Sequence, residues 1–267
     1  MSKLDFLPEQ WRDPARRAVA RSINVYHGCS WVLRPKTTAR GVENSALIDS
    51  MGDECCDRDE LIDLAVRLIQ ETRTVDLSDL CRRESGITEQ SLSRVLRWPG
   101  EHYRLLTAVA RVLSPRLVVE VGTFTGLSAL AILAGLGGSG KLVSYDLKEW
   151  NTFKDTALSA KDFGPNFEQR IGDLSDEGYF AAQKEIMLNA DVFFIDGPKN
   201  RTFEPKFTEL LIQCRSTATL LIFDDIRLLN MIEFWRTIPL PKLDFTSFGH
   251  WTGTGFVALM SAADLVE

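Results

Sequence analysis

The sequence predicts an α/β protein built on an open, mostly parallel sheet of seven strands, the last two of which form an antiparallel hairpin. From residue 117 onward, short apolar runs alternate with longer segments of helical periodicity, which is typical of βαβ units. The apolar runs contain few polar residues, as expected for strands that helices cover on both faces. Two final segments, separated by Trp251 to Thr254, predict the hairpin.

Five strands are expected before the hairpin, at 117–121, 141–146, 167–171, 191–195 and 218–223. The helices between them are expected at 126–136, 154–161, 176–188 and 203–214. A further helix is expected at 228–237, and the hairpin strands at 245–250 and 255–260. Ligands bind beyond the carboxyl ends of the strands in such sheets, so the residues that follow each strand are the candidates for function.

The first 85 residues are expected to form an N-terminal arm and helical extension beside a main domain at 86–267. Residues 1–55 show little periodicity and many prolines and glycines, which predicts an irregular arm. Helical patterns follow at 57–69, 76–83, 88–97 and 101–113. Three large aromatic residues in the arm favour packing against another surface, so we expect a homodimer whose interface or substrate pocket involves the arm.

Composition excludes several classes of function. The chain has 267 residues, 45% of them hydrophobic, and a formal net charge of −6, so non-specific nucleic-acid binding is not expected. No apolar run is long enough to span a bilayer, and the first twenty residues lack the apolar core of a secretory signal. The five cysteines include no C-x-x-C pair, which favours a reducing, cytoplasmic location.

A glycine-containing turn follows the first strand. Glu120 ends the apolar run, and Gly122 and Gly126 lie four residues apart before the next helix. Dinucleotide sites need a glycine where this chain has Phe124, so a pyrophosphate would meet a bulky side chain. The pattern E-x-G-x-x-x-G, with Ser128 two residues later, instead resembles the first motif of class I S-adenosylmethionine (SAM) methyltransferases.

A SAM site would use residues at the strand ends. Glu120 is expected to receive the ammonium group of SAM, Asp146 the ribose hydroxyls and Asp173 the adenine amino group. Ser128 either bonds the SAM carboxylate or caps its helix. Each acid taken alone could equally be a turn residue or a helix cap. The cofactor-binding candidates are Glu120, Gly122, Thr123, Gly126, Ser128, Asp146, Asp173 and Asp196.

Three further acids follow strands that should be neighbours. Asp196 comes after the fourth predicted strand, and Asp224 and Asp225 come after the fifth. Three close carboxylates repel one another unless a cation neutralises them. With no histidine or cysteine expected nearby, the ligands are hard oxygens that favour Mg²⁺, Mn²⁺ or Ca²⁺. Lys199 is a candidate general base if it is partly desolvated beside such an ion, and otherwise a surface lysine.

The sequence resembles the catechol and caffeoyl-CoA O-methyltransferase family over about residues 85–260. The likeness is carried by Gly86-Ile87-Thr88 and by the segment from Leu105 to Leu117, which runs into Val119-Glu120-Val121-Gly122-Thr123-Phe124-Thr125-Gly126. The resemblance implies a Rossmann-like fold, SAM as cofactor and a metal bound by Asp196, Asp224 and Asp225. It also implies that Lys199 is the catalytic base, with Asp196 beside it.

Two positions depart from that family. Asp225 stands where asparagine is usual, which resembles a related group of sugar-hydroxyl methyltransferases with three acids. A carboxylate that anchors the substrate hydroxyl in the catechol enzymes is missing, and His250 and Trp251 occupy its region. The identity of the substrate is therefore left open.

Together these patterns predict divalent-metal-assisted methyl transfer from SAM to a hydroxyl of a small molecule, either catechol-like or a vicinal diol. Two alternatives remain. The first is a metal-independent SAM methyltransferase that acts on nitrogen or a carboxylate, with the acids serving as caps. The second is a SAM-binding partner subunit without catalysis.

Overall fold

A computed structural model describes residues 59–83, 100–200, 202–214, 220–229 and 231–259. The predictions for the arm at 1–55 and for a helix at 88–97 lie outside these residues. Within the described part of the chain, no helix is both long and apolar enough to cross a membrane.

The sheet has seven strands in the order β3-β2-β1-β4-β5-β7-β6. The strands are β1 (Leu117–Val121), β2 (Lys141–Asp146), β3 (Phe167–Ile171), β4 (Val192–Ile195), β5 (Leu220–Asp224), β6 (Lys242–Asp244) and β7 (Thr254–Ala258). The first five pair in parallel, whereas β7 pairs antiparallel with both β5 and β6. The predicted fold class is therefore confirmed.

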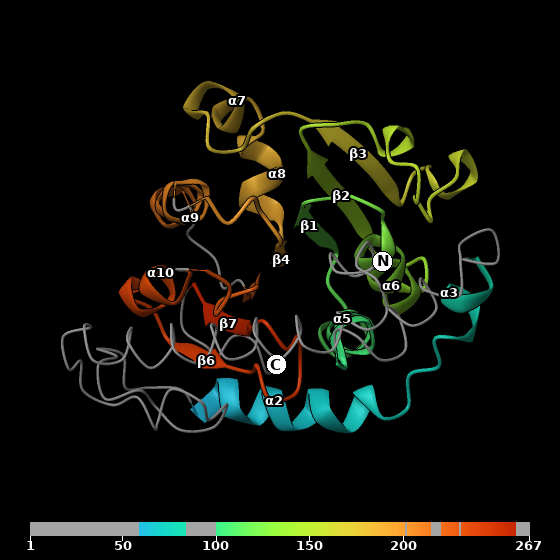
Figure 1. Cartoon of the computed structure of the whole chain (residues 1–267), viewed down its shortest axis with the longest axis horizontal. Coiled ribbons are helices and arrows are strands. Elements are labelled where there is room, and N and C mark those ends of the chain that lie inside the picture. The colour runs from blue at the N-terminus through green and yellow to red at the C-terminus, as the bar shows by residue number, and fades with distance from the viewer. Residues whose placement is uncertain (1–58, 84–99, 201, 215–219, 230, 260–267) are drawn as a thin grey trace, which may run out of the picture. The chain divides into compact units, whose positions relative to one another are not determined.

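Helices cover both faces of the sheet (Figure 1). One face carries α2 (Asp59–Thr72), α3 (Ser78–Arg83), α5 (His102–Leu113) and α6 (Leu127–Leu136). The other carries α7 (Glu177–Ala182), α8 (Lys184–Asn189), α9 (Phe203–Cys214) and α10 (Met231–Thr237). Successive strand residues point to opposite faces, so Val118 packs in the first layer and Val119 in the second.

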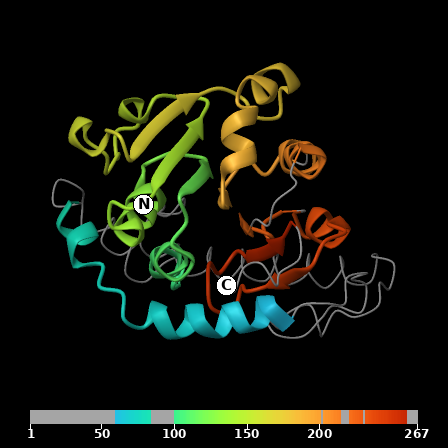
Figure 2. The same ribbon diagram turned by 180° about the vertical axis from the view of Figure 1, so that it is seen from behind.

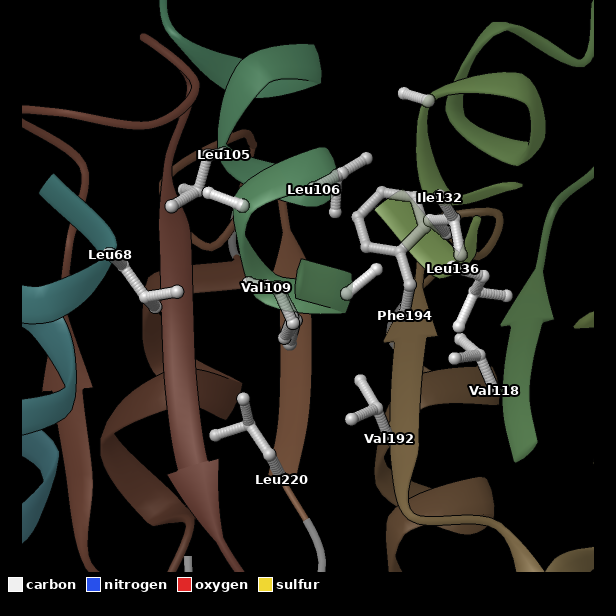
Figure 3. Close-up of a cluster of buried hydrophobic side chains, with 14 of the residues drawn as sticks. Leu68, Leu105, Leu106, Val109, Val118, Ile132, Leu136, Val192, Phe194 and Leu220 are labelled. Carbon is white, nitrogen blue, oxygen red and sulfur yellow. The ribbon is translucent and has the colours of Figure 1, made fainter. Parts of the chain in front are cut away.

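The first layer is an apolar core between α5, α6 and the strands. Figure 3 shows Leu106 and Val109 of α5 beside Phe194 and Val192 of β4. Leu68 of α2 belongs to the same buried cluster, and Figures 1 and 2 show α2 next to α5, which it crosses. The helix at 59–72 thus shares a core with the sheet, although the sequence assigned it to the N-terminal extension.

The helix predicted at 154–161 does not form, and this prediction was wrong. One short 3₁₀ turn precedes the segment at Trp150–Thr152, and another overlaps its end at Ala160–Asp162. The backbone N–H of Ala157 donates to the carbonyl of Thr125 at 2.8 Å, and Leu158 is buried against Gly126. Because these contacts hold the segment against the glycine turn, its moderate helical propensity is overridden.

The first strand of the hairpin was also misplaced. β6 spans Lys242–Asp244, whereas the sequence indicated 245–250. Asp244 ends the strand because its carboxylate accepts from the backbone N–H and the hydroxyl of Thr246, which turns the chain. The residues predicted as strand therefore form the loop that carries His250 toward the ends of the parallel strands.

Candidate active site

The sheet register brings the predicted residues to one edge. Val121 at the end of β1 lies opposite Ile195 of β4, and Ile195 lies opposite Phe223 of β5. The residues that follow, Gly122, Asp196 and Asp224, therefore leave the sheet at the same level.

Both glycines of the turn have positive φ angles, +100° at Gly122 and +79° at Gly126. A Cβ at Gly122 would lie 2.4 Å from the carbonyl oxygen of Asp196, and one at Gly126 would overlap Leu158. The sequence suggested that the glycines let a ligand approach. The structure shows that the close partners at these two positions are other parts of the chain.

Glu120 is fully buried and faces α6. Its carboxylate accepts hydrogen bonds from Ser128 at 2.6 Å and from Ser144 at 2.5 Å, and Ser144 also contacts the hydroxyl of Thr123 at 2.6 Å. Burial raises the pKa of Glu120 to about 8, although the two serine hydroxyls oppose the rise. Ser128 therefore bonds Glu120, and the α6 N-terminus has no side-chain cap.

A cavity of about 400 Å³ opens beyond the ends of β1, β2 and β4. Four of the eight predicted cofactor-binding residues line it: Gly122, Asp146, Asp173 and Asp196. Glu120, Thr123, Gly126 and Ser128 do not line it. Glu120 lies in β1, Thr123 and Gly126 lie in the turn that follows it, and Ser128 lies in the first turn of α6.

Asp146 and Asp173 present carboxylates to this cavity. Asp146 accepts from the backbone N–H of Phe124 at 2.9 Å and of Lys148 at 3.0 Å. Asp173 accepts from the backbone and the hydroxyl of Ser175. Each carboxylate oxygen has two lone pairs, so both side chains keep acceptor capacity for a ligand while the backbone fixes their position.

The three predicted metal ligands do come together. One carboxylate oxygen each from Asp196, Asp224 and Asp225 lies within 4.8 Å of the other two. Asp225 has a φ of +60° and its N–H donates to the carbonyl of Gly253 at 2.7 Å, which ties it to the loop before β7. Burial raises the pKa of Asp196 to about 6, although the nearby Lys199 opposes the rise.

Lys199 is buried and points into this cluster. Its Nζ donates to Asp196 at 2.9 Å and to the carbonyl of Gly197 at 3.2 Å. Its backbone has a φ of +53°, and the N–H is held by Glu204 at 2.9 Å. Lys199 is therefore no surface lysine. Burial alone would lower the pKa of Lys199, but the carboxylates of Asp196 and Asp224 outweigh it and raise the pKa above its usual value.

Two histidines lie beside the acids, so the prediction that none was near was wrong. His250 Nδ1 is 2.9 Å from Asp224 and 3.3 Å from Asp225, and His102 Nδ1 is 3.9 Å from the same oxygen of Asp224. Burial lowers the pKa of His250, but the hydrogen bonds and charges of the two acids outweigh it and raise the pKa to about 10. Burial lowers the pKa of His102, which Asp224 offsets only in part.

The histidines also act on Asp224. Burial would raise the pKa of Asp224, but His102 and His250 outweigh burial and hold it below the usual range. His102 begins α5, and its position beside β5 follows only from the packing of that helix. Nothing in the local sequence signals this contact. His250 was noticed at the right place in the sequence, but without a partner.

Comparison with known proteins agrees with this fold. Residues 119–226 match a family described as a methyltransferase domain, which is less than half of the chain. No curated protein matches the chain significantly.

Three solved structures illustrate the similarity. A candidate caffeoyl-CoA O-methyltransferase from Staphylococcus aureus has 15% identity and a TM-score of 0.51, covering 74% of this chain and 96% of its own. An SAH-bound methyltransferase from Podospora anserina has 14% identity and a TM-score of 0.49, covering 78% and 99%. A methyltransferase from Geobacter sulfurreducens has 20% identity and a TM-score of 0.47, covering 70% and 98%. At these identities the likeness concerns the fold.

Residues 119–226 match a methyltransferase domain, and the sheet order and the glycine turn after β1 agree with the fold of class I, SAM-dependent methyltransferases. The enzyme class predicted from the sequence is thereby confirmed at this level.

Proposed function

We propose that this protein transfers a methyl group from SAM to a hydroxyl of a small molecule, with the help of a divalent ion such as Mg²⁺, Mn²⁺ or Ca²⁺. One observation carries the proposal. Asp196 lines the cavity and is also one of the three clustered carboxylates, so a cofactor in the cavity and an ion on the acids would be neighbours.

The cofactor side of the proposal rests on Asp146 and Asp173, whose positions suit the ribose and the adenine of SAM. When bound there, SAM would supply an electrophilic methyl group. Gly122 and Asp196 would border its reactive end, and the protein's part is to orient the two reactants. Orientation of this kind contributes roughly 7–11 kcal/mol to lowering a barrier.

The residues on the other side suit a hard divalent ion. Three carboxylates within 4.8 Å repel one another, and oxygen ligands are those that Mg²⁺ and Ca²⁺ prefer. Asp196, Asp224 and Asp225 would hold the ion, whose role would be to lower the pKa of a substrate hydroxyl. Each of the three carboxylates also keeps a contact with Lys199 or His250, which fixes its orientation.

Lys199 would manage the proton of the substrate hydroxyl. Its Nζ is the buried ammonium nearest to the acids that the structure describes, and it is held by Asp196 at 2.9 Å. The acids that raise its pKa are the proposed ion ligands, so its proton affinity depends on how fully their charge is balanced. Lys199 would accept the hydroxyl proton only when that charge is balanced.

The acceptor class is a hydroxylated small molecule, catechol-like or a vicinal diol. The sequence resemblance supports it, and one structural neighbour of similar fold is described as a candidate caffeoyl-CoA O-methyltransferase. We also propose that the protein is a homodimer that requires residues 1–55. Light scattering on the full chain and on a deletion of residues 1–55, with activity measured on both, tests this assembly.

The decisive experiment is turnover of labelled SAM against a panel of catechols, diols, amines and carboxylic acids, with and without EDTA. We expect product only from hydroxyl acceptors, loss of product with EDTA and recovery with Mg²⁺ or Mn²⁺. Asp224→Asn should reduce turnover far more than it reduces affinity for S-adenosylhomocysteine. Asp63→Asn, which changes an exposed acid on α2, is the matched control and should have no effect.

Turnover that persists in EDTA, with a preference for amines or carboxylic acids, would favour the metal-independent alternative. Binding of S-adenosylhomocysteine without turnover on any acceptor would favour the non-catalytic subunit.

A further inference from the structure

His102, Asp224 and His250 form a cluster of a different chemical kind from the three acids. One ligand atom from each lies within 4.8 Å of the other two. The residues come from three separate elements: the first turn of α5, the end of β5 and the loop before β7. Imidazole nitrogens bind borderline ions such as Zn²⁺ more readily than they bind Mg²⁺ or Ca²⁺.

The geometry of this cluster suits a small ion. Metal–ligand distances of about 2.0–2.2 Å place the ligand atoms of a tetrahedral zinc site roughly 3.4 Å apart. The Nδ1 atoms of His250 and His102 lie 2.9 Å and 3.9 Å from the same oxygen of Asp224, on either side of that spacing. Small movements of the two rings would bring all three atoms to coordination distance.

His102 provides an independent reason to expect a ligand. It is 7% exposed, and its ring packs against Tyr103, Phe194 and His250. Among the residues that the structure describes, neither of its ring nitrogens takes part in a hydrogen bond, because 3.9 Å to Asp224 is too long for one. Within these residues the ring nitrogens of His102 are therefore available to bind an ion.

We propose that His102, Asp224 and His250 bind a borderline divalent ion, Zn²⁺ in particular, through a ligand set distinct from Asp196, Asp224 and Asp225. Both sets use Asp224, and in this respect the inference rests on the proposed function. The metal centre would then distinguish ions by their chemistry: Mg²⁺ on the three carboxylates and Zn²⁺ on the two imidazoles and one carboxylate.

The test is metal binding by the full chain without SAM or substrate, so its outcome does not depend on methyl transfer. Metal-free protein is titrated with Zn²⁺ and Mg²⁺ by calorimetry, and with Co²⁺ by visible absorption as a spectroscopic substitute for Zn²⁺. His102→Gln and His250→Gln should each weaken Zn²⁺ and Co²⁺ binding at least tenfold, and by a much larger factor than they weaken Mg²⁺ binding. Asp196→Asn should do the reverse, and circular dichroism checks that each variant is folded.

A second measurement uses the unchanged protein, in case the buried His102 cannot be replaced without unfolding. Cu²⁺ bound to the full chain should show hyperfine coupling to imidazole nitrogen in its paramagnetic resonance spectrum. Absence of nitrogen coupling, or Zn²⁺ affinities that are equal in the original chain and both histidine variants, would overturn the proposal. The histidines would then serve only to orient Asp224. Methyl transfer that fails while Zn²⁺ binding follows this pattern would refute the proposed function alone.

Discussion

Replacing Glu120 by glutamine tests the effect of a fully buried acid whose pKa is strongly raised. Glu120 is fully buried in β1, and its pKa is raised from 4.5 to about 8, first by burial. The folded state therefore binds a proton that the unfolded state releases between these two pH values. Stability from this group is fully present below about pH 4.5 and is lost as the pH rises through about 8.

The size of the effect follows from the two pKa values. One pKa unit corresponds to about 1.4 kcal/mol, so a rise from 4.5 to about 8 corresponds to roughly 5 kcal/mol of lost stability above pH 8. Glu120→Gln keeps the shape and a neutral side chain at every pH. Its amide can still pair with the hydroxyls of Ser128 and Ser144. The variant should therefore lack this loss.

The assay is urea unfolding of both proteins, without cofactor, at several values from pH 5 to pH 9. Other groups titrate in this range, among them Asp196, so the difference between the two proteins isolates Glu120. We expect the free energy of unfolding of the variant to rise relative to that of the original chain as the pH rises, by several kcal/mol in total. A difference that is constant with pH would refute the reasoning, since Glu120 would then titrate alike in both states.

The same variant tests whether Glu120 receives the ammonium of SAM. If it does, binding of S-adenosylhomocysteine near pH 7 should release a proton from the original chain, and Glu120→Gln should weaken binding. Calorimetry in two buffers of different ionisation enthalpy measures the proton. Unchanged affinity with no proton release would assign Glu120 to the turn alone.

Three further predictions concern single side chains. Asp146→Ala should weaken binding of S-adenosylhomocysteine by about 1.5–3 kcal/mol in calorimetry, because Asp146 supplies a charged acceptor and also fixes the Phe124 backbone. Unchanged binding would show that Asp146 does not bind the cofactor. Lys199→Ala should slow turnover roughly 10²–10⁴-fold and flatten the rise of rate with pH, whereas a small uniform loss would contradict a role as base. Lys242→Met should destabilise the fold by about 1–3 kcal/mol in urea, because the buried Nζ donates to three backbone carbonyls at the C-terminal end of α10. The control is Lys206→Met, which removes an exposed ion pair and should change the free energy of unfolding little. Equal destabilisation by both variants would contradict a stabilising role for the Lys242 hydrogen bonds.

The sheet could be predicted because its strands are continuous apolar runs. β1, β2 and β3 have the bounds expected from the sequence, β4 begins one residue later than expected, and β5 ends one residue later. Residues 218 and 219, with which β5 was expected to begin, lie outside the described part of the chain. Where local pattern and tertiary contact disagree, the prediction fails. The segment at 154–161 has helical composition, but its backbone is bonded to Thr125, and a carboxylate turn at Asp244 ends β6 early.

The acids of the site could be predicted for the same reason. Parallel strands deliver their next residues to one edge, so Asp196 and Asp224 had to meet once β4 and β5 were neighbours. His102 could not be predicted, since its place depends on how α5 packs against the sheet. The face of the sheet to which the Glu120 side chain points could not be predicted either. Side chains alternate between the two faces along β1, but which face α6 covers is known only from the structure.

The groups at the sheet edge are linked through shared residues. Gly122 must lack a side chain because the carbonyl of Asp196 approaches it, so the glycine turn and the acid cluster are in direct contact. Asp196 in turn lines the cavity and holds Lys199, while Asp224 joins the acids to the histidines. A change in charge at the acids would therefore reach the cavity through Asp196 without any movement of the sheet. If the proposed cofactor and ion bind here, this contact gives a physical reason to expect that each influences the binding of the other.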